Sequence, residues 1–317
     1  MRKHNLDDTL IKTGLFRFIV NVSNHTFSPS RCNLPSMYHL IRESGYNTFI
    51  HIRCSYNLHN LWPTNIQVNN MLISKIVTRV LGCGSGLLTK QLAKQVPRGK
   101  VYAVDIDSNM IKQTKNNLKS FDNVEIIQSS FTDVKLPRKM NVIFSNAALH
   151  WVLDHRKAFQ NFWAMLKPVK DSRSNNDSQL LIQCGGYGNL QQTITVLERI
   201  AHSASFKSYF ANWKQSWYFA KPDDTDALLE EIGYINRTIY LHSDRVFLPN
   251  RRIYSKFIKT VVMKPYLERL TVDNEGRKLK NLFLDLFLDE VEKCTNRSEE
   301  RWFLDYVRLN IVAYRGS

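Results

Sequence analysis

The sequence predicts an α/β fold with parallel strands, and three observations in its first half lead to this prediction. An apolar stretch at Val77–Leu81 is followed directly by the glycine-rich turn Gly82–Gly86. Apolar residues then recur at helical spacing over Leu87–Gln95. A second apolar stretch, Val101–Asp105, ends in a carboxylate. A strand, a turn, a helix and a strand in this order form a βαβ unit, whose two strands lie parallel.

The glycine-rich turn has the spacing of a ligand-binding loop. Gly82, Gly84 and Gly86 occupy alternate positions, so the backbone can turn tightly and a ligand can approach without meeting a Cβ atom. Asp105 follows at roughly the 20-residue distance where such folds place the acid that binds ribose hydroxyls. A dinucleotide fingerprint would need a glycine where the chain has Leu87. The alternative is a glycine loop that serves only to reverse the chain.

The alternation of helices and strands continues beyond Asp105. The expected elements are a helix at 109–118 capped by Ser108, a strand at 124–128, a strand at 141–146, a helix at 154–166 and a strand at 179–183. Helical stripes then dominate, at 190–201, 222–232, 252–262 and 279–291. Two β-like runs remain, at 238–247 and 306–314.

Composition is typical of a soluble globular protein. The chain has 317 residues, of which 43% are hydrophobic and 23% are charged, so it can bury a sizeable core. No apolar run reaches the ~20 residues that a membrane helix needs. The five cysteines are odd in number and show no zinc-binding spacing. This pattern favours a reducing, cytoplasmic location and predicts no metal site.

The formal net charge of +16 raises the question of an anionic partner. The excess of lysine and arginine is spread along the chain rather than gathered into one arm. A diffuse excess is typical of a solvated basic surface, and it also suits a small acidic substrate. A nucleic-acid partner stays an alternative that the charge pattern does not favour.

Two further motifs follow later strands. Residues 145–152 read Ser-Asn-Ala-Ala-Leu-His-Trp-Val, and residues 183–189 read Gln-Cys-Gly-Gly-Tyr-Gly-Asn. With the glycine-rich turn, these motifs make the chain resemble the S-adenosylmethionine-dependent methyltransferases of the seven-strand Rossmann-like type, and in particular their trans-aconitate methyltransferase branch. The resemblance covers roughly residue 76 to the C-terminus.

This resemblance implies a domain organisation. The fold would be a Rossmann-like, mostly parallel seven-stranded sheet flanked by helices, with a helical cap inserted toward the C-terminus. Residues 75–317 would form the methyltransferase domain, after an extension at 1–74 that shows no persistent periodicity. Within that domain, 75–190 would be the cofactor-binding core, 191–305 a largely helical cap with the sixth strand, and 306–317 the last strand.

The resemblance also implies S-adenosylmethionine as methyl donor. Its methionine end would lie on the turn, where backbone N–H groups and a helix N-terminus favour a carboxylate. Asp105 would accept hydrogen bonds from both ribose hydroxyls, the alternative being that it caps the turn before Ser108. The expected cofactor-binding residues are Gly82, Cys83, Gly84, Gly86, Asp105, Ile106, Ser130, Phe131 and Asn146.

The chain departs from the family pattern at two of these places. Relatives often carry an acid after the third strand, where this chain has Ser130 and Phe131. Ser130 can still bond the adenine amine and Phe131 can pack on the ring, the alternative being a solvated loop serine. Relatives also carry an acid near the methionine ammonium, where this chain has Val80. Losing that contact would weaken binding ~10- to 100-fold, which keeps a non-catalytic relative as an alternative.

The residues that contact the methyl acceptor are predicted from the later motifs, and the class of acceptor from motifs that the sequence lacks. His150 and Trp151 follow the fourth strand and are candidates to line the acceptor pocket, the alternative being packing roles. The Asn-Pro-Pro-Tyr motif that orients base amines is absent, and Cys184 lacks the Pro-Cys setting of cytosine enzymes. Methylating a carboxylate needs neither device, because that group is already ionised near neutral pH. Cap residues that could contact an anionic acceptor are Tyr218, Arg251, Arg252, Tyr254, Lys264 and Tyr266.

The resulting hypothesis is an S-adenosylmethionine-dependent methyltransferase that acts on a small, anionic acceptor, most plausibly a carboxylate. The first alternative is an RNA methyltransferase, because of the positive charge. The second is a methyltransferase fold retained as a non-catalytic binding module, because of Val80.

Overall fold

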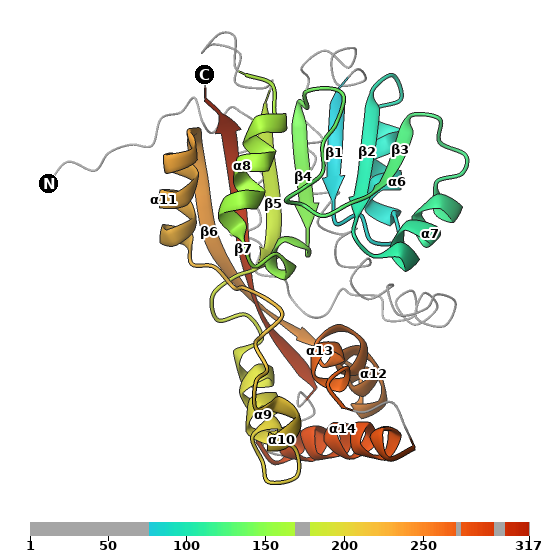
Figure 1. Ribbon diagram of the computed structural model, residues 1–317, viewed down its shortest axis with the longest axis vertical. Coiled ribbons are helices and arrows are strands. Elements are labelled where there is room, and N and C mark those ends of the chain that lie inside the picture. Colours follow the sequence, from blue (N-terminus) through green and yellow to red (C-terminus); the bar gives the residue numbers. More distant parts are fainter. Residues whose placement is uncertain (1–75, 169–177, 271–273, 295–301, 317) are drawn as a thin grey trace, which may run out of the picture. The chain divides into compact units, whose positions relative to one another are not determined.

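The computed structural model describes residues 76–168, 178–270, 274–294 and 302–316 (Figure 1). The predictions for residues 1–74 lie outside this part of the chain. Within it, strands form a seven-stranded sheet in the order β3-β2-β1-β4-β5-β7-β6. The strands are β1 (Val77–Leu81), β2 (Lys100–Asp105), β3 (Val124–Gln128), β4 (Val142–Asn146), β5 (Gln179–Gly185), β6 (Tyr234–Phe247) and β7 (Phe303–Arg315). The predicted α/β fold with a mostly parallel sheet is confirmed.

The chain forms two compact units that divide between Gln128 and Ser129. In the first, β1, β2 and β3 pair in parallel, joined by α6 (Leu87–Gln95) and α7 (Ser108–Asn117). Helix α6 begins and ends as its periodicity predicts, and it buries Leu88 and Leu92.

The prediction that Ser108 caps the second helix is wrong by one residue. Ser108 is the first helical residue, and Asp107 is the N-cap. The Asp107 carboxylate accepts hydrogen bonds from the backbone N–H groups of Asn109 at 2.7 Å and Met110 at 3.3 Å. Aspartate caps a helix as well as serine does, and an anion is further favoured at the positive end of the helix dipole.

In the second unit β4 and β5 are parallel, whereas β7 runs antiparallel to both β5 and β6. Helices α8 (His155–Met165) and α11 (Pro222–Ile232) lie side by side over this part of the sheet (Figure 1). The predicted apolar stripe of α8 is confirmed, because Phe159 and Phe162 are fully buried. The Tyr234 hydroxyl of β6 donates to the carbonyl of Phe159 at 2.9 Å and so ties the strand to this helix.

Strands β6 and β7 are longer than predicted and extend as a two-stranded ribbon beyond the end of β5. Helices α12 (Arg251–Val261), α13 (Lys264–Leu267) and α14 (Asn274–Cys294) lie between these two strands in the sequence, as the predicted helical insertion requires. They gather with α9 (Gln191–Ala201) and α10 (Lys207–Phe210) at the far end of the ribbon (Figure 1). No helix in the described ranges is long and apolar enough to cross a membrane.

Candidate functional site

The glycine-rich turn joins β1 to α6 in a left-handed backbone conformation. The φ angles are 65° at Gly82, 55° at Gly84 and 83° at Gly86, a region that side chains disfavour. A Cβ atom on Gly86 would lie 3.0 Å from Cγ2 of Thr114 and 3.2 Å from Cδ1 of Leu118. Gly86 is therefore required both by its backbone angle and by the close approach of α7.

Asp105 lies at the end of β2 and is bonded directly to this turn. Its Oδ2 accepts from the backbone N–H of Gly84 at 2.9 Å, and its Oδ1 accepts from that of Asp107 at 3.0 Å. The bond from Asp107 closes a local turn, which was the alternative role predicted for Asp105. The bond from Gly84 joins Asp105 to the glycine-rich turn. Burial raises the pKa of Asp105 above its ordinary value of 3.8, against the opposing effect of these backbone donors.

Two side chains of α7 hold the turn from its other side. The Thr114 hydroxyl donates to the carbonyl of Gly84 at 2.6 Å, and the Asn117 amide donates to that of Ser85 at 2.8 Å. Neither residue was predicted. The available signal was their spacing of three residues, which places them on one face of the predicted helix.

Two other predicted residues of the turn region differ in exposure. Cys83 is buried, and burial raises the pKa of its thiol to about 12, so the thiol stays protonated and serves as a packing group. Ile106 is 67% exposed beside Asp105. This exposed apolar side chain, next to the acid predicted to bind ribose, is available to a ligand. Val80 is part of the core and brings no carboxylate to the turn.

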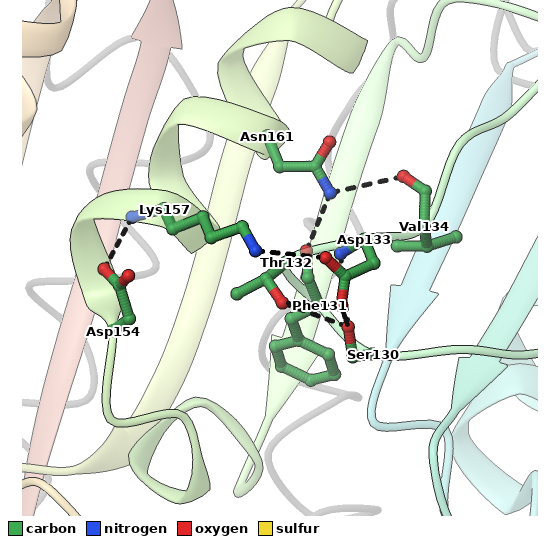
Figure 2. A network of polar contacts seen from close by, with 8 residues as sticks. All are labelled: Ser130, Phe131, Thr132, Asp133, Val134, Asp154, Lys157 and Asn161. Atoms are coloured by element: carbon green, nitrogen blue, oxygen red, sulfur yellow. Dashed lines mark hydrogen bonds and ion pairs between the residues drawn. The ribbon is translucent and has the colours of Figure 1, made fainter.

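The loop after β3 is ordered by a polar network (Figure 2). Asp133 Oδ2 accepts from the hydroxyls of Ser130 at 2.5 Å and Thr132 at 3.0 Å, and its Oδ1 accepts from Lys157 Nζ of α8 at 3.1 Å. The hydrogen bond from Ser130 and the contact with Lys157 lower the pKa of Asp133. The Asn161 side chain donates to the carbonyl of Phe131 at 2.8 Å. Ser130 is therefore part of a hydrogen-bonded network at the protein surface.

Two predicted cofactor residues are buried in this second unit. Phe131 packs edge-on against Phe162, with ring centroids 6.1 Å apart, so its ring contributes to the core. Asn146 is the last residue of β4 and is also buried. The next residue, Ala147, has a φ of 54°, which turns the chain sharply at the carboxyl end of the strand.

His150 lies on the short helix η2 (Leu149–Trp151) after β4. Its Nδ1 accepts the backbone N–H of Gly185 at 3.2 Å, so in the neutral imidazole the proton is on Nε2. Burial, then the charges of His155 and Arg308, lower the pKa of His150 to about 4. His150 is therefore neutral at physiological pH and is a weak base.

Aromatic residues lie close to His150. Trp151 is 43% exposed and its ring contacts that of His150 at 5.3 Å. The backbone N–H of Tyr218 donates to the carbonyl of His150 at 2.8 Å, and Tyr218 is itself half-exposed. Phe219 lies 5.8 Å from the imidazole. The loop after β4 and the segment before α11 thus form one surface of aromatic rings.

Three of the other predicted cap residues form contacts within the cap. Arg251 forms ion pairs with Asp289 at 2.9 Å and Glu292 at 2.7 Å, both on α14. Tyr254 and Tyr266 are fully buried among aromatic side chains. The remaining two candidates, Arg252 and Lys264, are exposed, and Lys264 is 3.8 Å from Glu268. Of the six candidates, only Tyr218 contacts the His150 region in the part of the chain that the structure describes.

Comparison with known proteins gives one family match and several relatives. The family described as "Methyltransferase domain" matches residues 80–169. An uncharacterized methyltransferase of Schizosaccharomyces pombe is 26% identical over 245 residues, which cover 74% of this chain and 85% of that protein. A trans-aconitate 2-methyltransferase of Deinococcus radiodurans is 25% identical over 246 residues, which also cover 74% of this chain and 85% of that protein.

A third relative is matched over a shorter length. The malonyl-[acyl-carrier protein] O-methyltransferase of Priestia megaterium is 27% identical over 143 residues, which cover 44% of this chain and 51% of that protein. The family match spans the strand-turn-helix segment, Asp105 and the motif after β4. Residues 80–169 thus match a methyltransferase domain, and with its seven-stranded α/β sheet the chain is similar to the S-adenosylmethionine-dependent methyltransferases of the Rossmann-like type.

Proposed function

We propose that this methyltransferase forms methyl esters on carboxylate groups of small organic acids. The observation that carries the proposal is the state of His150. Its Nδ1 accepts the Gly185 N–H and its pKa is lowered to about 4, so it cannot act as an effective base near neutral pH. A protonated amine, an alcohol or a phenol must lose a proton to be methylated, whereas a carboxylate is already ionised. Two relatives with O-methyltransferase or trans-aconitate methyltransferase names support the same acceptor class.

We also propose that the cofactor is held by the residues predicted from the sequence. The hydrogen bond between Gly84 and Asp105 supports a joint role, because it fixes the ribose-binding acid against the turn that receives the methionine end. Ile106 would contact the nucleoside, and Ser130 would accept a hydrogen bond from the adenine amine. Phe131 and Asn146 are buried, so they would offer the cofactor little side-chain surface.

Catalysis would then consist of positioning. S-adenosylmethionine, when bound, supplies a sulfonium methyl group to the attacking carboxylate oxygen. The chain's residues have to align that oxygen and exclude water. Alignment and exclusion of water can accelerate a methyl transfer that needs no proton transfer. The exposed rings of Trp151 and Tyr218 provide apolar area for the second task.

The test is a methylation assay with labelled S-adenosylmethionine and a panel of organic acids, their amides and the corresponding alcohols. A methyl ester releases its label as methanol in mild base, whereas N-methyl and ether products do not. We expect base-labile label only with the acids. Base-stable label would contradict a carboxylate acceptor, and label in an added RNA fraction would favour the RNA alternative.

Cofactor affinity is expected to fall on acidification because Asp105 must be ionised to accept both ribose hydroxyls. Burial raises its pKa above 3.8 in the free enzyme, so protonation begins at a higher pH than for an exposed aspartate. Affinity should be constant well above that pKa and fall by up to about tenfold per pH unit below it. Calorimetric titrations with S-adenosylhomocysteine across the acidic range measure this effect. Asp105→Asn, which does not titrate, should bind weakly at every pH and show no such slope.

A further inference from the structure

Arg308 of β7 lies next to the proposed acceptor site, although no sequence motif marks it. The strand register places Arg308 opposite Gly185 of β5, the residue whose N–H is bonded to His150. Residues directly opposite each other in an antiparallel pair project to the same face of a sheet. Arg308 and His150 therefore adjoin the same residue at the carboxyl end of β5.

The backbone around Arg308 is fixed. The N–H of Gly186 donates to the carbonyl of Val307 at 2.9 Å, and the N–H of Val307 donates to Oδ1 of Asn189 at 3.0 Å. A Cβ atom on Gly186 would lie 3.0 Å from the backbone N of Leu309, so the loop after β5 packs directly on β7. The second motif, residues 183–189, thus positions the strand that carries Arg308.

The charge of Arg308 is not neutralised within the described ranges. Arg156, Arg237 and Arg251 all form ion pairs with carboxylates there, whereas Arg308 forms none. Its guanidinium lies over the ring of Tyr306 at 4.5 Å. The nearby Asp305 carboxylate accepts the backbone N–H of Gln192 at 2.9 Å instead. Stacking on an aromatic ring orients a guanidinium and leaves its N–H donors available for a ligand.

The surroundings of Gly185 combine three features that suit an organic anion. Arg308 supplies a positive charge, and the neutral imidazole of His150, which faces Gly185 with Nδ1, adds no opposing charge. Phe219 supplies an apolar wall, because a Cβ atom on Gly185 would lie 2.6 Å from its ring. Guanidinium groups match the geometry of carboxylates and can bond both oxygens at once.

A cation at this position is better suited to a carboxylate that does not react. When a carboxylate attacks the sulfonium methyl, its negative charge decreases toward the transition state. A guanidinium on the attacking oxygen would therefore stabilise the ground state more than the transition state and would slow the reaction. A guanidinium on a second, unreactive carboxylate binds both states equally and improves affinity without this cost.

We propose that Arg308 binds a second carboxylate of the acceptor, so that the enzyme prefers dicarboxylic over monocarboxylic acids. This inference rests on the proposed carboxylate methylation and adds the residue that selects the acceptor. Uniform binding by Arg308 predicts that its loss raises KM and leaves kcat nearly unchanged.

The test compares Arg308→Gln with the wild type on succinate and glutarate and on their monoamides. We expect KM for the diacids to rise about 10- to 100-fold in the variant, and KM for the monoamides to change little. Arg308→Lys should recover part of the affinity, because it restores the charge and not the two-pronged geometry. The matched control is Arg245→Gln, since Arg245 also lies over an aromatic ring, that of Phe303, at 5.0 Å.

Calorimetry of succinate binding to the protein saturated with S-adenosylhomocysteine separates this inference from the proposed function. Binding by the wild type that is lost in Arg308→Gln and kept in Arg245→Gln supports the subsite even if no methyl ester forms. Equal binding by wild type and Arg308→Gln, no binding by the wild type, or equal KM values for diacids and monoamides would each overturn it. A fall in kcat with unchanged KM would also overturn it, since that result would place Arg308 at the reacting group.

Discussion

Replacing Asp105 with alanine is expected to weaken the binding of S-adenosylmethionine by at least about 100-fold. The carboxylate is the charged acceptor proposed for both ribose hydroxyls, and hydrogen bonds to a charged group contribute about 1.5–3 kcal/mol each. The same substitution removes the acceptor for the N–H of Gly84, so the turn also loses one of its supports. Calorimetric titration with S-adenosylmethionine and S-adenosylhomocysteine measures the loss.

The control for this substitution is Asp122→Ala, which removes an exposed carboxylate from the same unit. It should leave affinity within about twofold, because surface charges away from a site have small effects. Circular dichroism should show that Asp105→Ala keeps its secondary structure. Unchanged affinity in a folded Asp105→Ala protein would mean that the cofactor does not use this carboxylate.

Replacing Gly86 with alanine is expected to destabilise the protein by about 2–5 kcal/mol. A left-handed φ costs a residue with a side chain about 1–2 kcal/mol, and overpacking adds about 1–3 kcal/mol. The new Cβ would lie 3.0 Å from Cγ2 and 3.1 Å from Oγ1 of Thr114. Moving Thr114 away would stretch its hydrogen bond to Gly84, so the glycine-rich turn would be disturbed as well. Urea unfolding monitored by circular dichroism measures the change in stability.

Gly188→Ala is the matched control for Gly86→Ala. Gly188 has a φ of 81°, close to the 83° of Gly86, but a Cβ atom there would meet only Cγ2 of Val307 at 3.9 Å. It should therefore carry only the backbone cost of about 1–2 kcal/mol. Equal losses in the two variants would show that close packing by α7 contributes nothing to the requirement for glycine.

The sequence predicted the elements whose signals are local. Strand β1, helix α6 and the acid at the end of β2 were predicted almost residue by residue, because periodicity, glycine spacing and a terminal carboxylate all lie within 30 residues. The cap of α7 was misplaced by one residue because Asp107 and Ser108 are both good capping residues. Only the backbone geometry distinguishes them.

The sequence could not predict contacts between distant segments. Asn161 binds the carbonyl of Phe131, and Lys157 binds Asp133, although 30 and 24 residues, respectively, separate the partners. Arg308 reaches the neighbourhood of His150 only through the pairing of β5 with β7. Conversely, Arg251 and Tyr254 are residue types that can bind an anion. However, Arg251 is ion-paired with Asp289 and Tyr254 is buried in the cap. Residue type alone does not reveal which charges are already neutralised.

The fixed network around Ser130 has a consequence for nucleobase discrimination. The hydroxyl hydrogen of Ser130 is donated to Asp133, and the N–H of Asp133 occupies one of the oxygen lone pairs. The oxygen can therefore only accept a further hydrogen bond. If Ser130 contacts the base as proposed, an amino group at the purine 6-position can donate a hydrogen bond to it. The 6-oxo group of a deaminated, hypoxanthine-bearing analogue can only accept, so two acceptors would face each other. The enzyme would then reject such an analogue of its methyl donor.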